Sequence, residues 1–237
     1  MKTILNNIYR KYFILFLIKK YKNRDKIFEE IYKYNLWGDC ESFSGTGSSL
    51  LYTENLRKEL PLLLRKYNIN SIFDAPCGDF NWMNEVLKKN QIKYIGADIV
   101  EALIKKNREK YKSTDMVDFM VLDLVNDEYP NTDLMICRDC LFHLSYKDIF
   151  AILERFLISN TKFILVTSHD NNNSEFYNSD IKTGDFRKLD LFSAPFMFPK
   201  NSLEIINDWV DPDPPRAMHL FSREAILNAF QLNPFKK

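Results

Sequence analysis

The chain has 237 residues, of which 46% are hydrophobic and 27% charged, with 33 Lys and Arg against 32 Asp and Glu. This hydrophobic content supplies a core and excludes a disordered chain, and the length suits one large domain or a domain with a small appendage. A net charge of +1 gives no bulk electrostatic reason to bind nucleic acid, so nucleic acid is not an expected partner.

The first segment, residues 1–36, reads as helical and basic. Its apolar core, 13–18, is six residues long, whereas a membrane-spanning helix needs about 20. No small-residue cleavage site of the signal-peptide kind is present. We expect a helix that packs on the domain. The alternative is a basic helix lying in a membrane interface, so membrane association is possible but not expected.

The cysteines indicate a reducing compartment. No secretory context supports disulfides, and a cytoplasmic location is the simpler expectation. Cys137 and Cys140 form a lone CxxC, and no second pair has the spacing that a four-ligand zinc site needs, so no metal is expected.

The middle of the chain alternates between short strands and helices. Residues 38–49 form a loop rich in Gly and Ser, and 50–67 have the apolar spacing of an amphipathic helix. The strands predicted after it are 71–74, 93–97, 119–123, 134–137 and 162–168, and the helices are 81–89, 100–111 and 146–158. This order predicts an α/β fold with a doubly wound, mostly parallel sheet, whose ligands lie beyond the carboxyl ends of the strands.

The pattern changes after the fifth predicted strand. Residues 169–200 are a long polar and aromatic excursion. A loop of this length is either functional or disordered, and its aromatic residues argue against disorder. Residues 203–210 and 217–222 then read as two strands joined by the proline-rich turn DPDPPR.

The most informative stretch is SIFDAPCGDFNWM, residues 71–83. A buried strand ends in Asp74, a tight turn of small residues follows, and Asp98 ends the next strand 20 residues after Gly78. This is the layout of a nucleoside-binding βαβ unit, in which the second acid accepts hydrogen bonds from ribose hydroxyls. Because Pro76 and Phe80 stand near positions where a dinucleotide site needs glycine, the turn suits a cofactor without phosphate.

These residues resemble the class I S-adenosylmethionine-dependent methyltransferases. The first motif of that family, acidic-x-Gly-x-Gly-x-Gly, maps onto Asp74, Pro76, Gly78 and Phe80, with two of the three glycines replaced. The resemblance implies a Rossmann-like, seven-stranded sheet with an antiparallel ending and S-adenosyl-L-methionine as cofactor. It divides the chain into an N-terminal helical extension with a Gly/Ser lid loop, 1–49, and a methyltransferase domain, 50–237, with an acceptor-binding insertion, 169–200.

The predicted cofactor-binding residues lie at the carboxyl ends of four predicted strands. They are Asp74, Ala75, Pro76, Gly78, Asp98, Ile99, Asp123, Leu124 and Arg138. In the family resembled, Asp123 or Leu124 would lie beside the adenine. Gly78 is the expected close-approach residue, and Asp74 either orients the turn or binds the methionine amino group.

Two histidines compete for the role of general base. A neutral hydroxyl acceptor must lose a proton when it is methylated, and His is the usual base near neutral pH. His169, at the end of the fifth strand, is the better placed by sequence, and His143 is either a second candidate or a packed helix residue. Asp139 is expected to orient a histidine or to bind the acceptor.

The segments ESFSGTGSS, YNSDIKTGDFRKLDL and LFSAPFMFP resemble a bacterial subgroup linked to surface-glycan or secondary-metabolite pathways. The predicted substrate-binding residues are Ser44, Tyr177, Asn178, Asp180 and Arg187. The function expected is O-methylation of a small-molecule or glycan acceptor at a sugar, sugar-phosphate, phosphoryl or phosphoramidate oxygen. The alternatives are an inactive methyltransferase-fold binding protein and an NAD-type oxidoreductase. The sequence predicts no oligomeric state.

Overall fold

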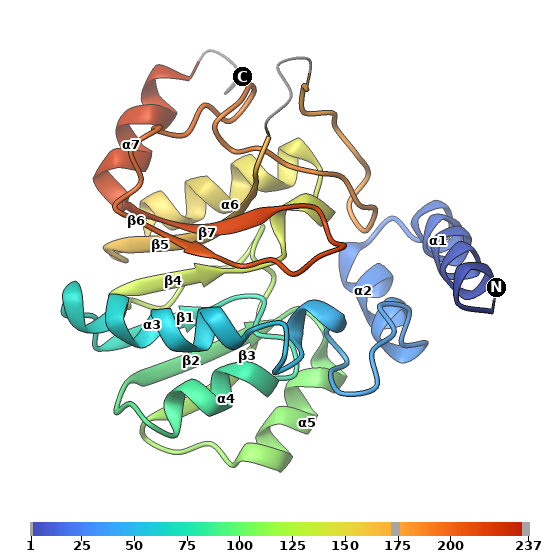
Figure 1. The fold of residues 1–237 in the computed structure, drawn as a ribbon, viewed down its shortest axis with the longest axis horizontal. Helices are drawn as coiled ribbons and strands as arrows, with labels where there is room; N and C mark the ends of the chain where they lie inside the picture. The colour runs from blue at the N-terminus through green and yellow to red at the C-terminus, as the bar shows by residue number, and fades with distance from the viewer. Residues whose placement is uncertain (1, 172–175, 234–237) are drawn as a thin grey trace.

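The structure is a computed structural model and describes residues 2–171 and 176–233. Within them, seven strands form one sheet in the order β3-β2-β1-β4-β5-β7-β6 (Figure 1). The strands are β1 (Ser71–Asp74), β2 (Lys93–Asp98), β3 (Val117–Val121), β4 (Leu134–Cys137), β5 (Phe163–His169), β6 (Glu204–Asn207) and β7 (Arg216–Ser222). The first five are parallel, and β7 is antiparallel to both β5 and β6. The predicted fold class is therefore confirmed.

Alternation along the central strands divides the core between the two faces of the sheet. Ile72 contributes to one hydrophobic cluster and its neighbour Phe73 to the other, because successive side chains of a strand point to opposite faces. Helices α3 (Glu54–Lys66), α4 (Asn81–Leu87) and α5 (Glu101–Tyr111) bury apolar residues on the Ile72 face. Helices α6 (Tyr146–Ile158) and α7 (Arg223–Leu232) cover the Phe73 face. Apolar runs buried on both faces are typical of parallel strands whose connecting helices cover the sheet.

Several boundaries differ from the sequence-based prediction. β3 lies two residues earlier than the predicted strand. Leu122 and Asp123 follow it without regular structure, and the turn begins at Leu124. β6 ends at Asn207 rather than at 210. The next residue, Asp208, accepts a hydrogen bond from Arg138 through its carboxylate. Helix α7 was not predicted, although Ser222 caps its N-terminus by accepting a hydrogen bond from Ala225 N at 3.1 Å.

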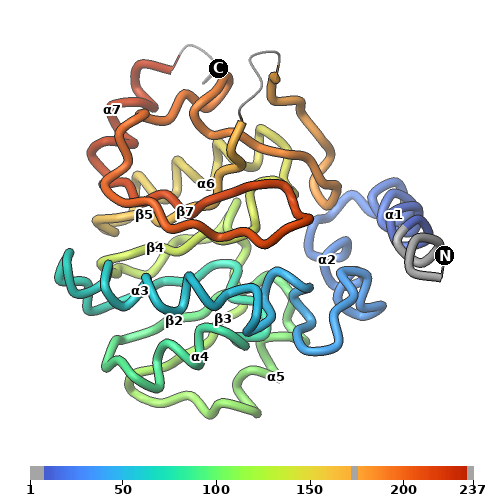
Figure 2. Tube along the Cα trace, in the orientation of Figure 1, coloured from blue at the N-terminus to red at the C-terminus, as the bar shows by residue number. Residues whose placement is uncertain are grey.

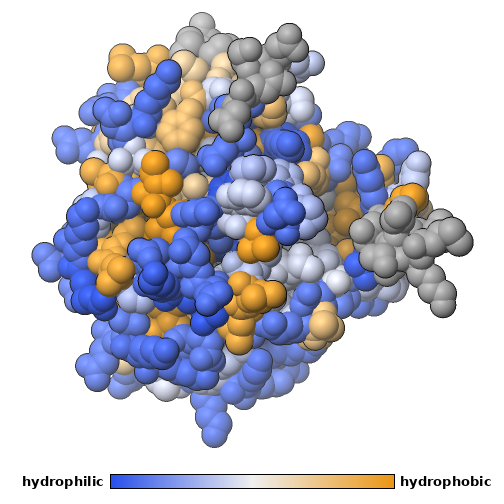
Figure 3. Space-filling view, viewed as in Figure 1, coloured by the Kyte–Doolittle hydropathy of each residue, from blue (hydrophilic) through white to orange (hydrophobic). Residues whose placement is uncertain are grey.

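The N-terminal extension consists of two helices rather than one. Helix α1 (Lys2–Lys20) projects from the side of the domain, and α2 (Arg24–Lys33) lies between it and the sheet (Figures 1 and 2). Leu17 and Ile18 of α1 pack with Ile27 and Ile31 of α2. In the part of the chain that is described, no helix is long and apolar enough to cross a membrane. Figure 3 shows small hydrophobic areas scattered over a mostly hydrophilic face.

Residues 176–202 contain no helix or strand. This part of the predicted insertion is nevertheless anchored to the domain through its backbone. Gly184 N donates to His143 O at 2.7 Å, and His169 N donates to Leu189 O at 2.8 Å. Positions 172–175 of the insertion, and the outer ends of the predicted 1–49 and 50–237 divisions, lie outside the described residues.

Candidate active site

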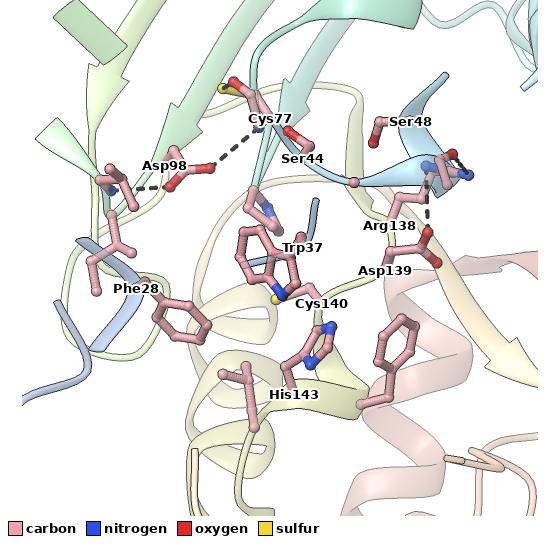
Figure 4. A pocket seen from close by; sticks show the side chains of 18 of the residues that line it. Phe28, Trp37, Ser44, Ser48, Cys77, Asp98, Arg138, Asp139, Cys140 and His143 are labelled. Carbon is pink, nitrogen blue, oxygen red and sulfur yellow. Dashed lines mark hydrogen bonds and ion pairs between the residues drawn. The ribbon is translucent and has the colours of Figure 1, made fainter. Parts of the chain in front are cut away.

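A cavity of about 330 Å³ lies beyond the carboxyl ends of β1, β2, β4 and β5 (Figure 4). This is where a doubly wound sheet places its ligands, because the strand order reverses between β1 and β4. Twelve of the predicted site residues line it: Ser44, Asp74, Pro76, Gly78, Asp98, Ile99, Asp123, Leu124, Arg138, Asp139, His143 and His169. Helix α2 and the segment after it close the cavity from outside with Arg24, Phe28, Trp37 and residues 43–48.

Asp98 is a buried acceptor at the end of β2. Its Oδ2 accepts a hydrogen bond from Gly78 N at 3.2 Å, and its Oδ1 accepts one from Val100 N at 3.0 Å. Burial raises the pKa of Asp98 to about 6, although these backbone donors act in the opposite direction. The carboxylate also faces the cavity (Figure 4). It therefore lies where additional hydroxyl donors would stabilise its charge.

Asp74 lies deeper, at the end of β1. Tyr94 donates its hydroxyl proton to Asp74 Oδ2 at 2.7 Å. Burial raises the pKa of Asp74 to about 7, and Tyr94 and Arg138 offset only part of this rise. Ala75 is fully buried behind the turn and does not line the cavity.

The Gly/Ser loop packs directly on the turn between β1 and α4. Ser44 Oγ accepts a hydrogen bond from Asp79 N at 3.0 Å, and the Asp79 carboxylate accepts from Phe43 N at 2.9 Å and from Ser42 Oγ at 3.0 Å. A Cβ at Gly78, where φ is +55°, would lie 2.1 Å from Ser44 Oγ. Because of this contact the loop is a fixed wall of the cavity.

We expect Gly78→Ala to lower the free energy of unfolding by about 1–3 kcal/mol. The left-handed backbone alone costs an L-residue about 1–2 kcal/mol, and the new methyl group must displace Ser44. Urea unfolding measures the loss. In the Gly78→Ala/Ser44→Gly double variant, the loss should be smaller than the sum of the two single losses, because the steric part is relieved. Strictly additive losses would contradict the contact.

Three buried charges, Arg138, Asp208 and Arg216, form a network with the partly exposed Asp139 at the floor of the cavity. Arg138 donates from Nε and Nη2 to the two oxygens of Asp208, at 2.8 and 3.0 Å, and from Nη2 to Gly47 O at 2.7 Å. Arg216 donates from Nε and Nη2 to the two oxygens of Asp139, both at 2.9 Å. Burial alone would raise the pKa of Asp139, but Arg138 and Arg216 lower it below its usual value. The network therefore joins the end of β4, β7 and the Gly/Ser loop through charge-assisted hydrogen bonds. Burial raises the pKa of Asp208, although Arg138 acts in the opposite direction.

Both oxygens of Asp139 accept from Arg216, and among the described residues no hydrogen bond joins Asp139 to either histidine. Arg138 is likewise engaged by Asp208 and the loop carbonyl, although it lines the cavity. Both residues hold the cavity floor in place, and Asp139 lends negative charge to it.

The two histidines have opposite tautomers when neutral. His143 Nδ1 lies 2.9 Å from Asp185 O, and a carbonyl only accepts, so Nδ1 carries the proton and Nε2 keeps its lone pair. His169 Nδ1 accepts a hydrogen bond from Leu189 N at 3.2 Å, so the proton of the neutral ring is on Nε2. Burial lowers the pKa of both rings, that of His169 to about 4. Both are therefore neutral at pH 7, but only His143 has a free basic nitrogen.

Arg24, which sequence reasoning missed, braces the predicted adenine side of the cavity. It donates from Nε to Asp123 Oδ2 at 3.2 Å and from Nη1 to Asp148 Oδ1 at 2.9 Å. The Asp123 carboxylate also accepts from Val125 N at 3.0 Å. The charge of Asp123 is thus partly engaged by α2, whereas Ile99 and Leu124 present apolar surface to the cavity.

Four of the predicted substrate-binding residues do not line the cavity. Tyr177 is exposed to solvent. Asn178 donates to Asp190 O and Ala194 O, both at 2.8 Å, and Asp180 accepts from Tyr146 N at 2.7 Å. Arg187 is buried against the Tyr146 ring and donates to Leu144 O at 2.7 Å. In the described part of the insertion, these three residues hold the segment together.

The insertion contributes Phe186 to the cavity instead. Its ring lies 5.5 Å from that of Phe142 and 5.8 Å from that of His143, and the Trp37 ring lies 6.0 Å from His143. Aromatic rings thus surround the imidazole of His143. No spacing rule in the sequence distinguishes Phe186 or Trp37 from the other aromatic residues of the chain.

Among the described residues, no group of three or more His, Cys, Asp or Glu side chains is arranged to hold a metal ion. All four cysteines are free thiols. Cys77 and Cys140 line the cavity, and burial contributes to raising the pKa of both thiols well above the usual value.

Comparison with solved structures places the fold among methyltransferases. The magnesium protoporphyrin IX methyltransferase of Synechocystis PCC 6803, solved with SAH, superposes with a TM-score of 0.57 at 12% identity over 82% of this chain and 97% of that chain. The N-methyltransferase NodS of Bradyrhizobium japonicum WM9 gives 0.54 at 9% identity over 72% and 96%.

Human N-acetylserotonin methyltransferase, solved with SAM, gives a TM-score of 0.52 at 15% identity over 83% of this chain and 58% of that chain. Neither a scan against protein-family models nor a search of curated protein sequences gives a match. At these identities the likeness is one of fold, and function has to be argued from the site.

Proposed function

We propose that this protein is an S-adenosylmethionine-dependent methyltransferase that methylates an oxygen of a small-molecule or glycan acceptor. The proposal rests on two neighbouring features of the cavity. The carboxylate of Asp98 faces it, and Ser44 packs against Gly78 of the adjoining turn. A buried carboxylate that faces a cavity suits ribose hydroxyls. A turn with a side chain packed against its glycine leaves little room for a pyrophosphate, which disfavours an NAD-type oxidoreductase.

The cavity suits this cofactor in size and in chemistry. About 330 Å³ falls at the lower end of the volumes of small-molecule sites, roughly 300–1,000 Å³. Ile99 and Leu124 offer apolar surface for a base, Asp98 offers acceptors for ribose, and Asp74 lies beside the turn where the amino-acid portion would bind. Structural neighbours solved with SAM or SAH support the same choice. When bound, the cofactor supplies an electrophilic methyl group on a sulfonium.

We assign the general base to His143, which reverses the ranking expected from the sequence. A base must present a lone pair, and the hydrogen bond from His143 Nδ1 to Asp185 O leaves the lone pair on Nε2. The depressed pKa keeps the ring neutral at pH 7 and thus able to accept a proton. Negative charge on Asp139 stabilises the imidazolium that would form.

His169 is assigned a binding role. Its neutral ring carries the proton on Nε2 and can donate a hydrogen bond to an acceptor oxygen. Arg216 opposes protonation of this ring electrostatically, which also makes His169 a poor base. His169 therefore favours an oxygen acceptor, because oxygen accepts the bond that it offers.

The acceptor end of the cavity combines rings with charge. Phe142, Phe186 and Trp37 form apolar walls near His143, and Arg216 with Asp213 lies on another side. Rings and paired charges suit a polar ring compound such as a sugar, whose apolar faces stack and whose hydroxyls bond. A sugar phosphate, phosphoryl or phosphoramidate oxygen is the variant in which Arg216 binds the anion.

Two measurements test the proposal. Calorimetry should show micromolar binding of S-adenosylmethionine or its demethylated product, and much weaker binding of NAD. Incubation with the cofactor and a panel of sugars, sugar phosphates and polysaccharide fragments should give a single methyl addition by mass spectrometry. Tighter binding of NAD overturns the cofactor assignment. Cofactor binding without any methylated product across the panel would favour an inactive binding protein instead.

A further inference from the structure

Helix α1 carries an exposed aromatic and basic surface that the proposed methyl transfer does not use. Ile8, Tyr12 and Phe16 follow one another at intervals of four residues and so lie along one face of the helix, and Tyr9 lies beside them. Tyr12 is 69% exposed and Phe16 52%. We name these four residues, with Tyr34, Lys11, Lys19 and Lys20, the α1 surface.

The ring of Phe13 joins Tyr9, Phe16 and Tyr34 of the α1 surface. Phe13 stacks between Tyr9 and Phe16, with ring centroids 5.9 and 6.1 Å away, and its ring meets Tyr34 of the α2 C-cap edge-on at 5.2 Å. Lys20 Nζ lies 5.9 Å from the centroid of Phe16. Tyr9, Tyr12 and Phe16 are each more than half exposed, and exposed rings gathered on one face are unusual where that face contacts only water.

The opposite side of α1 is already used. Leu17 and Ile18 are buried against α2, and Ile18 also lies close to Gly184 of the insertion. This packing fixes which face of α1 points outward, so the α1 surface remains without a partner among the described residues of the chain. Figures 1 and 2 show α1 at the periphery, away from the sheet.

Charge decides which partner fits. Helix α1 contains five basic residues and no acidic one. Tyrosine and phenylalanine next to lysine are the composition of helices that lie in a membrane interface, where rings enter the headgroup region and ammonium groups meet anionic lipid. A second copy of the chain fits less well, because symmetric pairing of this surface would bring lysines against lysines.

We propose that α1 docks this protein on an anionic lipid surface, with the rings of Tyr9, Tyr12 and Phe16 in the headgroup layer and Lys11, Lys19 and Lys20 at the lipid phosphates. The docking is peripheral, since α1 is not apolar enough to cross a bilayer. It places the cavity, whose wall includes Arg24 just after α1, close to the membrane.

Flotation of the full-length protein with phosphatidylcholine vesicles, with and without phosphatidylglycerol, tests the proposal. We expect binding to vesicles that contain phosphatidylglycerol and its loss at high salt. Tyr12→Ser/Phe16→Ser and Lys11→Ala/Lys19→Ala should each lower the partition coefficient about tenfold or more. The matched controls Leu51→Ser and Lys58→Ala, at exposed positions outside α1, should leave it unchanged.

Three results would overturn the proposal: no preference for anionic vesicles, unchanged binding in both α1 variants, or dimerisation that Tyr12→Ser/Phe16→Ser abolishes in the absence of lipid. Circular dichroism establishes that each variant is folded. Because the readout is lipid binding, the result is independent of whether the methyltransferase assignment holds.

Discussion

Replacing His143 by Asn should lower turnover by about 10²–10⁴, the span that a general base contributes. This variant is preferable to Ala, because the Asn side-chain amide can still donate to Asp185 O in place of Nδ1 while it offers no basic nitrogen. Cofactor affinity should change little, since the imidazole acts on the proton of the acceptor. Single-turnover assays with saturating cofactor and acceptor measure the loss.

The pH profile separates a base from a packing residue. Burial lowers the pKa of His143 from its ordinary value of 6.5. The ring is therefore deprotonated and competent at pH 7, and kcat/KM should fall only on the acid side, with a midpoint below 6.5. His169→Ala should raise KM for the acceptor more than it lowers kcat, because His169 is assigned a hydrogen bond rather than a proton transfer.

Full turnover in His143→Asn at saturating acceptor would contradict the assignment. If His169→Ala alone lost turnover, the ranking drawn from the sequence would be restored. If neither variant lost it, the acceptor would be ionised at neutral pH, as a phosphoryl oxygen is. Arg216 would then be the first residue to test for acceptor binding.

The strand-end residues were predictable because their positions follow from topology. Once Asp74, Asp98 and His169 are read as the last residues of parallel strands, the sheet itself brings them to one edge. The position of Arg216 could have been predicted in the same way, although the sequence analysis did not include it. A final strand antiparallel to its neighbour begins at the edge where the parallel strands end, and Arg216 pairs with His169 in register.

Other parts of the site depend on contacts that no local pattern encodes. Arg24 and Trp37 reach the cavity only because α2 packs where it does, and their local sequence reads as an ordinary amphipathic helix and its end. The tautomer of His143 is set by the backbone of Asp185, 42 residues away in the chain, and that of His169 by the backbone of Leu189, 20 residues away. Sequence identified both imidazoles as candidates, but the choice between them needed these two hydrogen bonds.

Replacing Asp98 by Ala should weaken cofactor binding by about 2–4 kcal/mol, or roughly 30- to 1,000-fold, because two hydrogen bonds from ribose to a charged acceptor are lost. Binding to the parent protein should also weaken as the pH falls through about 6, where the carboxyl is protonated. Calorimetry measures both effects. Asp118→Ala, at an exposed position of β3, is the matched control and should bind normally.

Cofactor affinity should rise with pH, but the free energy of unfolding of the ligand-free protein should fall. The pKa of Asp98 is about 6 in the folded chain, against an ordinary value of 3.8, so between these two pH values the folded chain binds the extra proton. Stability contributed by this group therefore falls as the pH rises from about 4 to 7, by about 3 kcal/mol. Asp98→Asn removes the titrating charge, but its amide can accept from only one of Gly78 N and Val100 N, so one hydrogen bond is lost at every pH.

Relative to the parent, Asp98→Asn should be less stable at pH 4.5 than at pH 7, because only the parent gains stability by binding the extra proton as the pH falls. Urea unfolding of parent and variant at the two pH values measures the difference between them. A difference independent of pH would show that Asp98 titrates normally in the folded protein and is not desolvated. A pH-dependent difference, together with weak cofactor binding by Asp98→Ala, would mean that Asp98 lowers the stability of the ligand-free protein but is needed to bind the ligand.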